Sequence, residues 1–225
     1  APIIAVTGTN GKTTTVSFLD HLLKALGKKV FTGGNIGVAF CDHINSGKEV
    51  DYILLELSSF QLESTFDFRP KIAVLLNVFP NHGERYSKNE DYAKAKFNIV
   101  KKMKSEDRLI YDSGNQMVAE WGDKFPGTKV AIATEQTGKI EASLKEIFSL
   151  QDFKLPGIHN KINLSFCLEV LKGLNLLEGN RPLIQKAIDS FTGVSHRIEY
   201  VPSKESFEIY NDAKSTNWDA TLTAI

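Results

Sequence analysis

The feature that most constrains this chain is a glycine-rich turn between a short apolar run and an amphipathic segment. The turn reads Gly8-Thr9-Asn10-Gly11-Lys12-Thr13. Residues 2–6 before it predict a buried strand, and residues 16–26 after it predict an amphipathic helix. Glycines allow a backbone to curl around an anion. Because the N-terminus of a helix favours negative charge, we interpret the turn as a phosphate-binding loop.

Two side chains support this interpretation. Lys12 supplies an ammonium group for outer phosphates, and the Thr13 hydroxyl can ligate Mg²⁺. The general pattern G-x-x-x-x-G-K-[ST] places its first glycine where this chain has Val6, so the loop is a shorter variant. The alternative is an ordinary turn with a chance Lys-Thr pair. The strand before the loop and the helix after it favour phosphate binding.

Strand and helix patterns alternate along most of the chain. Expected strands are 3–6, 29–32, 52–57, 72–76, 108–112 and 129–133. Expected helices are 16–26, 92–103, 116–121, 161–174 and 181–191. This alternation predicts an α/β fold with a mostly parallel, doubly wound sheet of P-loop type.

The remaining segments predict smaller structures. We expect residues 134–155 to form a small antiparallel sheet. The pattern breaks near residue 194 and is followed by two further strands, 198–201 and 207–210. We therefore divide the chain into a nucleotide-binding domain, 1–194, and the truncated start of a second domain, 195–225.

Composition excludes several classes of protein. Of 225 residues, 42% are hydrophobic and 24% are charged, which is typical of a soluble globular protein. A net charge of zero predicts no nucleic-acid partner. Two distant cysteines indicate a reducing compartment without disulfides. With no apolar run of about 18 residues and no signal-peptide pattern, we expect a cytoplasmic protein without a membrane partner.

Polar residues follow several expected strands, where ligands bind in open α/β sheets. Asn35 lies among three glycines in 33–37, which allow close approach of a ligand or form a flexible turn. Glu56 lies in an apolar strand, where a carboxylate is costly unless it binds a metal or pairs with a lysine. His82 follows 77–81 and is either a metal ligand beside oxygen ligands or a solvated loop residue.

Other candidates lie nearer the C-terminus. Asn160 and Asn163 share one helix face, and their amides could read a purine edge. Helix capping by Asn160 is the alternative. Arg197 could reach a phosphate from across a cleft, and Asp212 could accept a hydrogen bond from a ribose hydroxyl.

In chain order, these segments resemble the Mur ligase family of ATP-dependent enzymes that form amide bonds. The matching segments are 8–13, 34–37, 56–62, 77–86, His159-Asn160-x-x-Asn163, His196-Arg197 and 211–217. Folylpolyglutamate synthetases share the first of them. Leu-Ser-Ser-Phe-Gln-Leu, 57–62, resembles the family member that joins D-glutamate to UDP-N-acetylmuramoyl-L-alanine. The resemblance spans essentially the whole chain, and covers the family's central domain and the beginning of its Rossmann-like C-terminal domain.

The resemblance implies a reaction in cytoplasmic peptidoglycan precursor synthesis. ATP would phosphorylate the muramoyl substrate's carboxylate to an acyl phosphate. The amine of D-glutamate would attack it, and a tetrahedral intermediate would give the amide, ADP and phosphate. Contacts to ATP are implied for Gly8, Thr9, Asn10, Gly11, Lys12, Thr13, Thr14, Asn160, Asn163, Arg197 and Asp212. Substrate contacts are implied for Asn35, Ser58, Gln61, Lys214 and Thr216.

Two magnesium sites and a modified lysine are implied as well. Thr13 and Glu56 would hold one ion, and His82 would help to hold a second beside the acyl phosphate. The family uses a carbamylated lysine as a carboxylate-like metal ligand, and its Tyr-x-x-x-Lys pattern selects Lys96. The implied catalytic side chains are Lys12, His82 and Lys96. Lys94 lies two residues off the pattern, and a plain surface lysine is the other alternative.

Two other functions remain open at the level of the sequence. One is a ligase acting on another muramoyl peptide or on folate, which 58–61 disfavours. The other is a nucleotide-binding module without ligase chemistry, since Asn81 stands where the family usually has Asp. Because residue 3 already lies in an expected strand and 217–225 enter a helix without a cap, we expect a piece of a longer protein. We expect this protein to be monomeric and, as a fragment, inactive by itself.

Overall fold

A six-stranded parallel sheet forms the centre of the computed structural model, which describes residues 1–204, 207–215 and 221–222. Its strands are β1 (Ile3–Thr7), β2 (Val30–Gly34), β3 (Tyr52–Glu56), β4 (Ile72–Leu75), β5 (Arg108–Asp112) and β6 (Thr128–Ile132). Their order is β2-β3-β1-β4-β5-β6, and every neighbouring pair is parallel. All six expected strands are confirmed. Since parallel strands end at one edge, the polar segments that follow them meet there.

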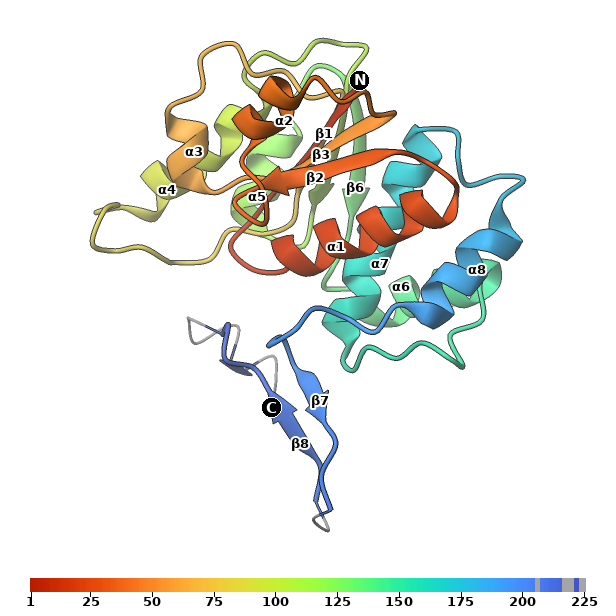
Figure 1. The fold of residues 1–225 in the computed structure, drawn as a ribbon. Helices are drawn as coiled ribbons and strands as arrows, with labels where there is room; N and C mark the ends of the chain where they lie inside the picture. The colour runs from red at the N-terminus through yellow and green to blue at the C-terminus, as the bar shows by residue number, and fades with distance from the viewer. Residues whose placement is uncertain (205–206, 216–220, 223–225) are drawn as a thin grey trace.

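Helices cover both faces of this sheet (Figure 1). On one face lie α1 (Lys12–Ala25), α6 (Thr137–Ile147), α7 (Ile158–Gly173) and α8 (Arg181–Ser190). On the other lie α3 (Ser59–Glu63), α4 (Asn89–Phe97), the 3₁₀ helix η1 (Asn98–Val100) and α5 (Gln116–Gly122). Alternation along the strands produces the two cores, because Ile4 and Val6 pack with α1 whereas Ala5 packs with the opposite layer. The expected doubly wound fold is confirmed.

The prediction of a small sheet over 134–155 is wrong in its position. Residues 137–147 form the helix α6 instead. Ile140, Leu144 and Phe148 recur every four residues, which is the spacing of one helix face, and all three pack in the core beside α7. The small antiparallel sheet consists of β7 (Glu199–Val201) and β8 (Ile209–Asn211), paired through Tyr200 and Tyr210.

Two short helices were not predicted. The helix α2 (Phe40–Ser46) contains no buried residue. The helix α3 begins with a capping box, in which the Ser58 hydroxyl accepts from the Gln61 N–H at 3.3 Å and the Gln61 side chain accepts from the Ser58 N–H at 3.0 Å. The helix expected over 92–103 instead begins at Asn89 and ends in the 3₁₀ turn η1.

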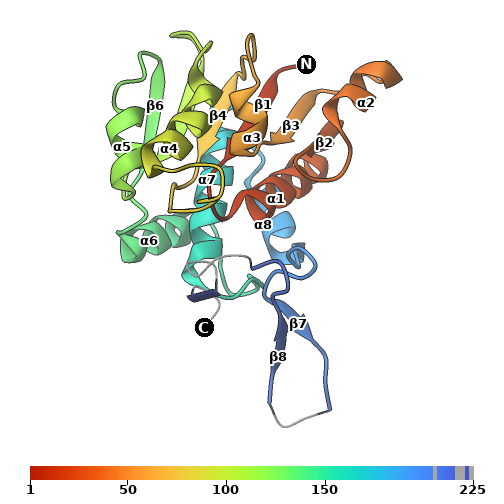
Figure 2. The same cartoon turned by 90° about the vertical axis from the view of Figure 1, so that its left-hand side faces the viewer.

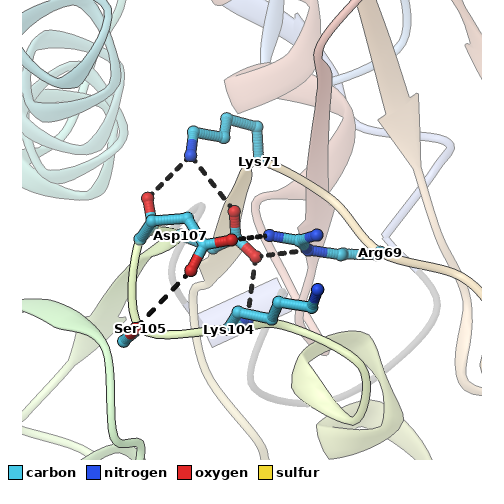
Figure 3. A network of polar contacts seen from close by, with 6 residues as sticks. Arg69, Lys71, Lys104, Ser105 and Asp107 are labelled. Carbon is cyan, nitrogen blue, oxygen red and sulfur yellow. Dashed lines mark hydrogen bonds and ion pairs between the residues drawn. The ribbon is translucent and has the colours of Figure 1, made fainter.

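Opposite the phosphate loop, an ion-pair network ties together the amino ends of β4 and β5 (Figure 3). Asp107 is 1% exposed and accepts from Arg69 Nε at 2.7 Å and from the Lys104 N–H at 2.8 Å. Lys71 Nζ lies 3.3 Å from the same carboxylate. Burial alone would raise the pKa of Asp107, but the hydrogen bonds from Arg69, the Lys104 N–H and Lys71 outweigh it and lower the pKa.

The hairpin β7–β8 lies apart from the main sheet, beyond the carboxyl edge of its strands (Figure 2). The segment before it connects α8 to Arg197, which returns to the phosphate loop. The division of the chain near residue 194 stays a prediction. Within the described residues, no helix combines the length and apolar character that crossing a bilayer requires.

Candidate nucleotide-binding site

The loop between β1 and α1 presents an open helix N-terminus. Gly11 is the N-cap residue of α1, with a left-handed φ of 84°, and no side chain in the described part of the chain caps this end. A Cβ at Gly11 would lie 2.9 Å from Asn163 Oδ1, so both backbone and space require glycine here. The first N–H groups of a helix have no intrahelical acceptor. They are therefore available to an anion, and the helix dipole favours one.

Two lysines converge on this loop, the partly exposed Lys12 and the buried Lys96. Lys12 Nζ donates to the carbonyls of Gly8 at 2.8 Å and Thr9 at 2.9 Å. Lys96 is 1% exposed, donates to the Gly8 carbonyl at 2.8 Å and lies 4.5 Å from the centre of the Tyr92 ring. Burial lowers the pKa of Lys12, and Arg197 lowers it further, against the raising effect of Glu56. Burial and the charge of Lys12 hold the pKa of Lys96 well below its ordinary value, with Glu56 opposing them.

Glu56 supplies an incompletely satisfied carboxylate to the same edge. It is the last residue of β3, the strand directly beside β1, and it pairs in register with Val6. Its side chain is 1% exposed, and Oε1 accepts from Asn35 Nδ2 at 2.8 Å. Oε2 is buried and has no hydrogen-bond partner among the described residues. An anionic oxygen left in this way is costly, so the position is suited to a bound cation.

His82 lies on the segment that follows β4, at the same edge of the sheet. It is half-exposed, adopts a left-handed φ of 56°, and its Nδ1 lies 3.2 Å from Glu84 Oε1. Its ring meets that of Tyr92 edge-on, with centroids 6.0 Å apart. The Tyr92 hydroxyl lies 3.3 Å from Thr9 Oγ1, so His82 is connected to the loop through one aromatic ring.

A cleft of about 1110 Å³ opens beside the loop. It is lined by Asn10, Gly11, Thr14, His159, Asn160, Asn163, Arg197, Asp212 and further residues from the hairpin and from the ends of β4, β5 and β6. Burial lowers the pKa of His159, and the Asp212 carboxylate opposes this effect. The cleft brings together predicted ATP contacts from both sides of residue 194, whereas Gly8, Thr9, Lys12 and Thr13 lie outside its lining.

The two asparagines of α7 lie side by side and are buried. Asn163 Oδ1 accepts from Thr15 Oγ1 at 3.3 Å, and its Nδ2 donates to Asn160 Oδ1 at 3.4 Å. Asn160 Nδ2 donates to the Pro156 carbonyl at 2.6 Å. The N-cap of α7 is Gly157, so the alternative of a cap at Asn160 is wrong.

Arg197 reaches the loop from beyond residue 194. Its Nη2 donates to Thr13 Oγ1 at 3.0 Å, and its Nε is buried without a hydrogen-bond partner among the described residues. Asp212 Oδ1 accepts from the Ile198 N–H at 3.1 Å, which fixes the carboxylate at the start of the hairpin. Lys214 is exposed, and Thr216 lies outside the described residues.

Other predicted site residues make local contacts only. Ser58 and Gln61 form the capping box of α3, so their polar groups begin a helix in this structure. Lys94 is exposed whereas Lys96 is buried, which excludes the alternative of a plain surface lysine at Lys96. No group of three or more His, Cys, Asp or Glu side chains with metal-binding geometry occurs within the described ranges.

One residue of the site was missed. Asn77 was noted only as part of the segment before His82, yet its side chain binds the phosphate loop through three hydrogen bonds. Its position, an asparagine two residues beyond the strand next to β1, was the available signal. Sequence alone did not show that its amide faces the loop, because the strand order was unknown.

Comparison with known proteins places this geometry in a family. The profile of the Mur ligase middle domain matches residues 6–171. UDP-N-acetylmuramoylalanine–D-glutamate ligases from Geotalea uraniireducens and Geobacillus are each 35% identical over the whole chain, and the one from Desulfotalea psychrophila is 37% identical. The chain spans about half the length of these relatives, 52%, 51% and 51% respectively.

Solved structures agree on the fold. MurF from Acinetobacter baumannii has a TM-score of 0.75 at 15% identity, covering 99% of this chain and 52% of its own. MurF ligase from Thermotoga maritima, in complex with ADP, has a TM-score of 0.70 at 19% identity, covering 100% of this chain and 56% of its own. With the profile match over most of its length, the chain belongs to the Mur ligase family.

Proposed function

We propose that this chain is the ATP-binding part of a ligase that adds D-glutamate to UDP-N-acetylmuramoyl-L-alanine. The observation that carries the proposal is a convergence at one sheet edge. The start of α1, Lys12, Arg197 and Glu56 meet there, and among the residues that the structure describes no side chain caps α1 and none bonds Glu56 Oε2. The similarity to UDP-N-acetylmuramoylalanine–D-glutamate ligases supports the choice of substrates. We further propose that the enzyme is a cytoplasmic monomer.

ATP fits the cleft as a substrate. Its phosphates would occupy the loop 8–14, where Lys12 and Arg197 supply positive charge. The adenine would lie against Asn160 and Asn163, and the ribose against Asp212, since all three line the cleft. For this binding, Arg197 would exchange its bond to Thr13 for bonds to phosphate oxygens.

Magnesium fits the oxygen donors present. The buried Glu56 Oε2 and the Thr13 hydroxyl are hard ligands, which Mg²⁺ prefers, and ATP phosphates would complete the set. When bound, Mg²⁺ would neutralise charge on the phosphates. We propose that His82 and a carbamylated Lys96 help to hold a second ion.

Burial of Lys96 supports its carbamylation. Only a neutral amine attacks CO₂, and the lowered pKa of Lys96 makes that form accessible. In this step the nitrogen bonds to the CO₂ carbon and releases a proton, which leaves a carbamate anion. The product would place a carboxylate-like group beside Gly8, where Lys96 Nζ now lies.

The chain's contribution to the reaction is mainly positioning and electrostatics. An oxygen of the substrate carboxylate would attack the γ-phosphorus, and ADP would leave. The amine of D-glutamate would then add to the acyl carbon, and the tetrahedral intermediate would expel phosphate. Lys12 and the loop N–H groups stabilise the charge on the transferred phosphoryl group. Asn35, Ser58 and Gln61 would face the muramoyl substrate, and Lys214 and Thr216 the entering amino acid.

Product formation by the intact protein that carries this chain tests the proposal. The protein is incubated with ATP, Mg²⁺ and UDP-N-acetylmuramoyl-L-alanine plus D-glutamate, and the nucleotide product is weighed by mass spectrometry. Parallel reactions replace the acceptor with a longer muramoyl peptide or with a folate. We expect product only in the first reaction. Product in a parallel reaction alone, or none in any, would overturn the assignment.

A further inference from the structure

The side chain of Asn77 holds the phosphate-binding loop from the neighbouring strand. Its Oδ1 accepts from the Thr9 N–H at 3.1 Å and from the Asn10 N–H at 2.8 Å. Its Nδ2 donates to the Asn10 carbonyl at 3.2 Å. The Thr9 N–H also donates to the Asn77 carbonyl at 2.9 Å. Three backbone groups of the loop are thus bound by one residue.

These contacts extend the pairing of β1 and β4 into the loop. The Leu76 N–H donates to the Thr7 carbonyl at 3.0 Å, one residue beyond the last pair in register. A Cβ at Gly8 would lie 3.0 Å from Leu76 Cβ and 3.3 Å from the Asn77 nitrogen. The absence of a side chain at Gly8 therefore permits the close approach that brings Asn77 to the loop.

Only an amide side chain meets all three demands at once. The loop needs an acceptor for two N–H groups and a donor for one carbonyl, which asparagine provides without charge. Aspartate would accept both N–H groups but would face the Asn10 carbonyl with another acceptor. It would also add negative charge where phosphates are proposed to bind.

The contacts separate the N–H groups of the loop into two sets. Those of Thr9 and Asn10 bind Asn77. Those of Lys12, Thr13 and Thr14 belong to the uncapped first turn of α1. Because Asn77 holds the Thr9 and Asn10 N–H groups, this part of the loop is ordered before a ligand binds. Ligand binding therefore costs less conformational entropy.

We propose that Asn77 is a positioning residue that preorganises the loop for the phosphates of ATP. This inference rests on the proposed function, because it takes ATP as the ligand of the loop. Asn77 acts through Thr9 and Asn10, which lie at the start of the loop, so its removal should weaken recognition of phosphate more than recognition of adenosine.

The test measures nucleotide binding to the intact protein by calorimetry, with Mg²⁺ present. For Asn77→Ala we expect at least tenfold weaker ATP binding and less than twofold change in adenosine binding. In turnover, the KM for ATP should rise while the KM for the muramoyl acceptor stays unchanged. Asn77→Asp retains an acceptor for both N–H groups, so it should fold like the wild type and still lose ATP affinity.

Asn115→Ala is the matched control. Asn115 Nδ2 donates to the Val78 carbonyl at 3.0 Å, and its Oδ1 accepts from the Val118 N–H at 3.2 Å at the start of α5. This variant should lower the melting temperature but leave ATP affinity within twofold. Equal losses of ATP and adenosine affinity in the Asn77 variants, or unchanged ATP affinity, would overturn the inference. Wild-type protein that binds no ATP would contradict the proposed function and this inference with it.

Discussion

At the scale of single residues, charge is buried around the phosphate loop with few counter-charges. Lys96 and Glu56 are each 1% exposed, yet Lys96 binds a carbonyl and Glu56 binds an amide. The sequence left open that Glu56 pairs with a lysine. For Oε1 this alternative is wrong, because that oxygen accepts a hydrogen bond from Asn35. Burying a charge without an ionic partner lowers stability. The burial of Lys96 and Glu56 therefore indicates a functional site, in which a ligand supplies the missing partners.

Removal of the Lys12 ammonium should abolish most phosphoryl transfer. No other side chain of the loop 8–13 is a cation, and one lost electrostatic donor costs roughly 10²- to 10³-fold in kcat. We expect Lys12→Ala in the intact protein to lose ATP turnover on that scale, measured by phosphate release. Lys24→Ala, on the same helix but in an exposed pair with Asp20, is the control and should turn over normally. Near-normal turnover of Lys12→Ala would remove the site assignment.

The buried Lys96 should also make stability depend on pH. Its folded-state pKa is lowered, so the unfolded chain binds the proton more readily. The free energy of unfolding should therefore rise with pH between the lowered pKa and the ordinary value of about 10.4. In CO₂-free buffer, Lys96→Met should reduce this slope, whereas Lys94→Met, at an exposed position, should not. Urea titrations across that range measure it, and an identical slope in Lys96→Met would contradict the prediction.

At the scale of elements, local sequence patterns predicted some strands and helices correctly and others wrongly. The central strands β1, β3 and β4 are predictable because they are continuous apolar runs that lie largely buried inside the sheet. The apolar residues at Ile140 and 147–150, taken as separate short segments, predict strands, whereas the four-residue spacing of Ile140, Leu144 and Phe148 is that of the helix face which the structure shows. The capping box of α3 is a recognisable signal, yet Ser58 and Gln61 were assigned only to substrate.

The network at the amino ends of β4 and β5 should stabilise the sheet that carries the site. In Asp107→Asn, Arg69, Lys71 and the Lys104 N–H lose a buried anion, which we expect to lower the free energy of unfolding by about 2 kcal/mol. Because the folded pKa of Asp107 is lowered, this contribution is present above about pH 3.9 and is lost as pH falls through the folded pKa. The cost of the substitution should therefore shrink from pH 7 to pH 3.

Urea unfolding of the two proteins at both pH values checks this prediction. The control is Asp67→Asn, because Asp67 is 92% exposed and pairs with the half-exposed Lys102 at 3.2 Å. Exposed pairs contribute little, so this variant should match the wild type at both values. An effect of Asp107→Asn no larger than that of Asp67→Asn would show that the network does not stabilise the sheet.

At the scale of the whole molecule, the cleft is shared between the main sheet and the hairpin. Arg197 and Asp212 line it from beyond residue 194, together with Asn160 and Asn163. We propose that Arg197 and the hairpin β7–β8 move relative to the main sheet when ATP binds, because Arg197 must exchange its Thr13 contact for phosphate. The chain spans about half the length of its relatives. This difference is the basis of the next prediction, which concerns ATP binding and amide formation by the 225 residues.

These 225 residues should bind ATP weakly and form no amide by themselves. The described residues hold the proposed phosphate site, but the relatives' remaining half is absent from the chain. Calorimetry measures ATP binding by the 225 residues. Mass spectrometry of a reaction with both substrates measures amide formation. The intact protein in the same reaction is the control. Detection of UDP-N-acetylmuramoyl-L-alanyl-D-glutamate from the 225 residues alone would refute the prediction.

The sequence by itself determined the strand–loop–helix unit around Gly8–Thr13, because buried strands, glycine turns and helix starts depend on near neighbours in the chain. It also indicated Glu56 and Arg197 as candidates for that loop. Only the tertiary structure decided that β4 lies beside β1, which places Asn77 on the loop and Tyr92 between Thr9 and His82. Contacts between residues tens of positions apart follow from strand order and packing, which no local pattern specifies.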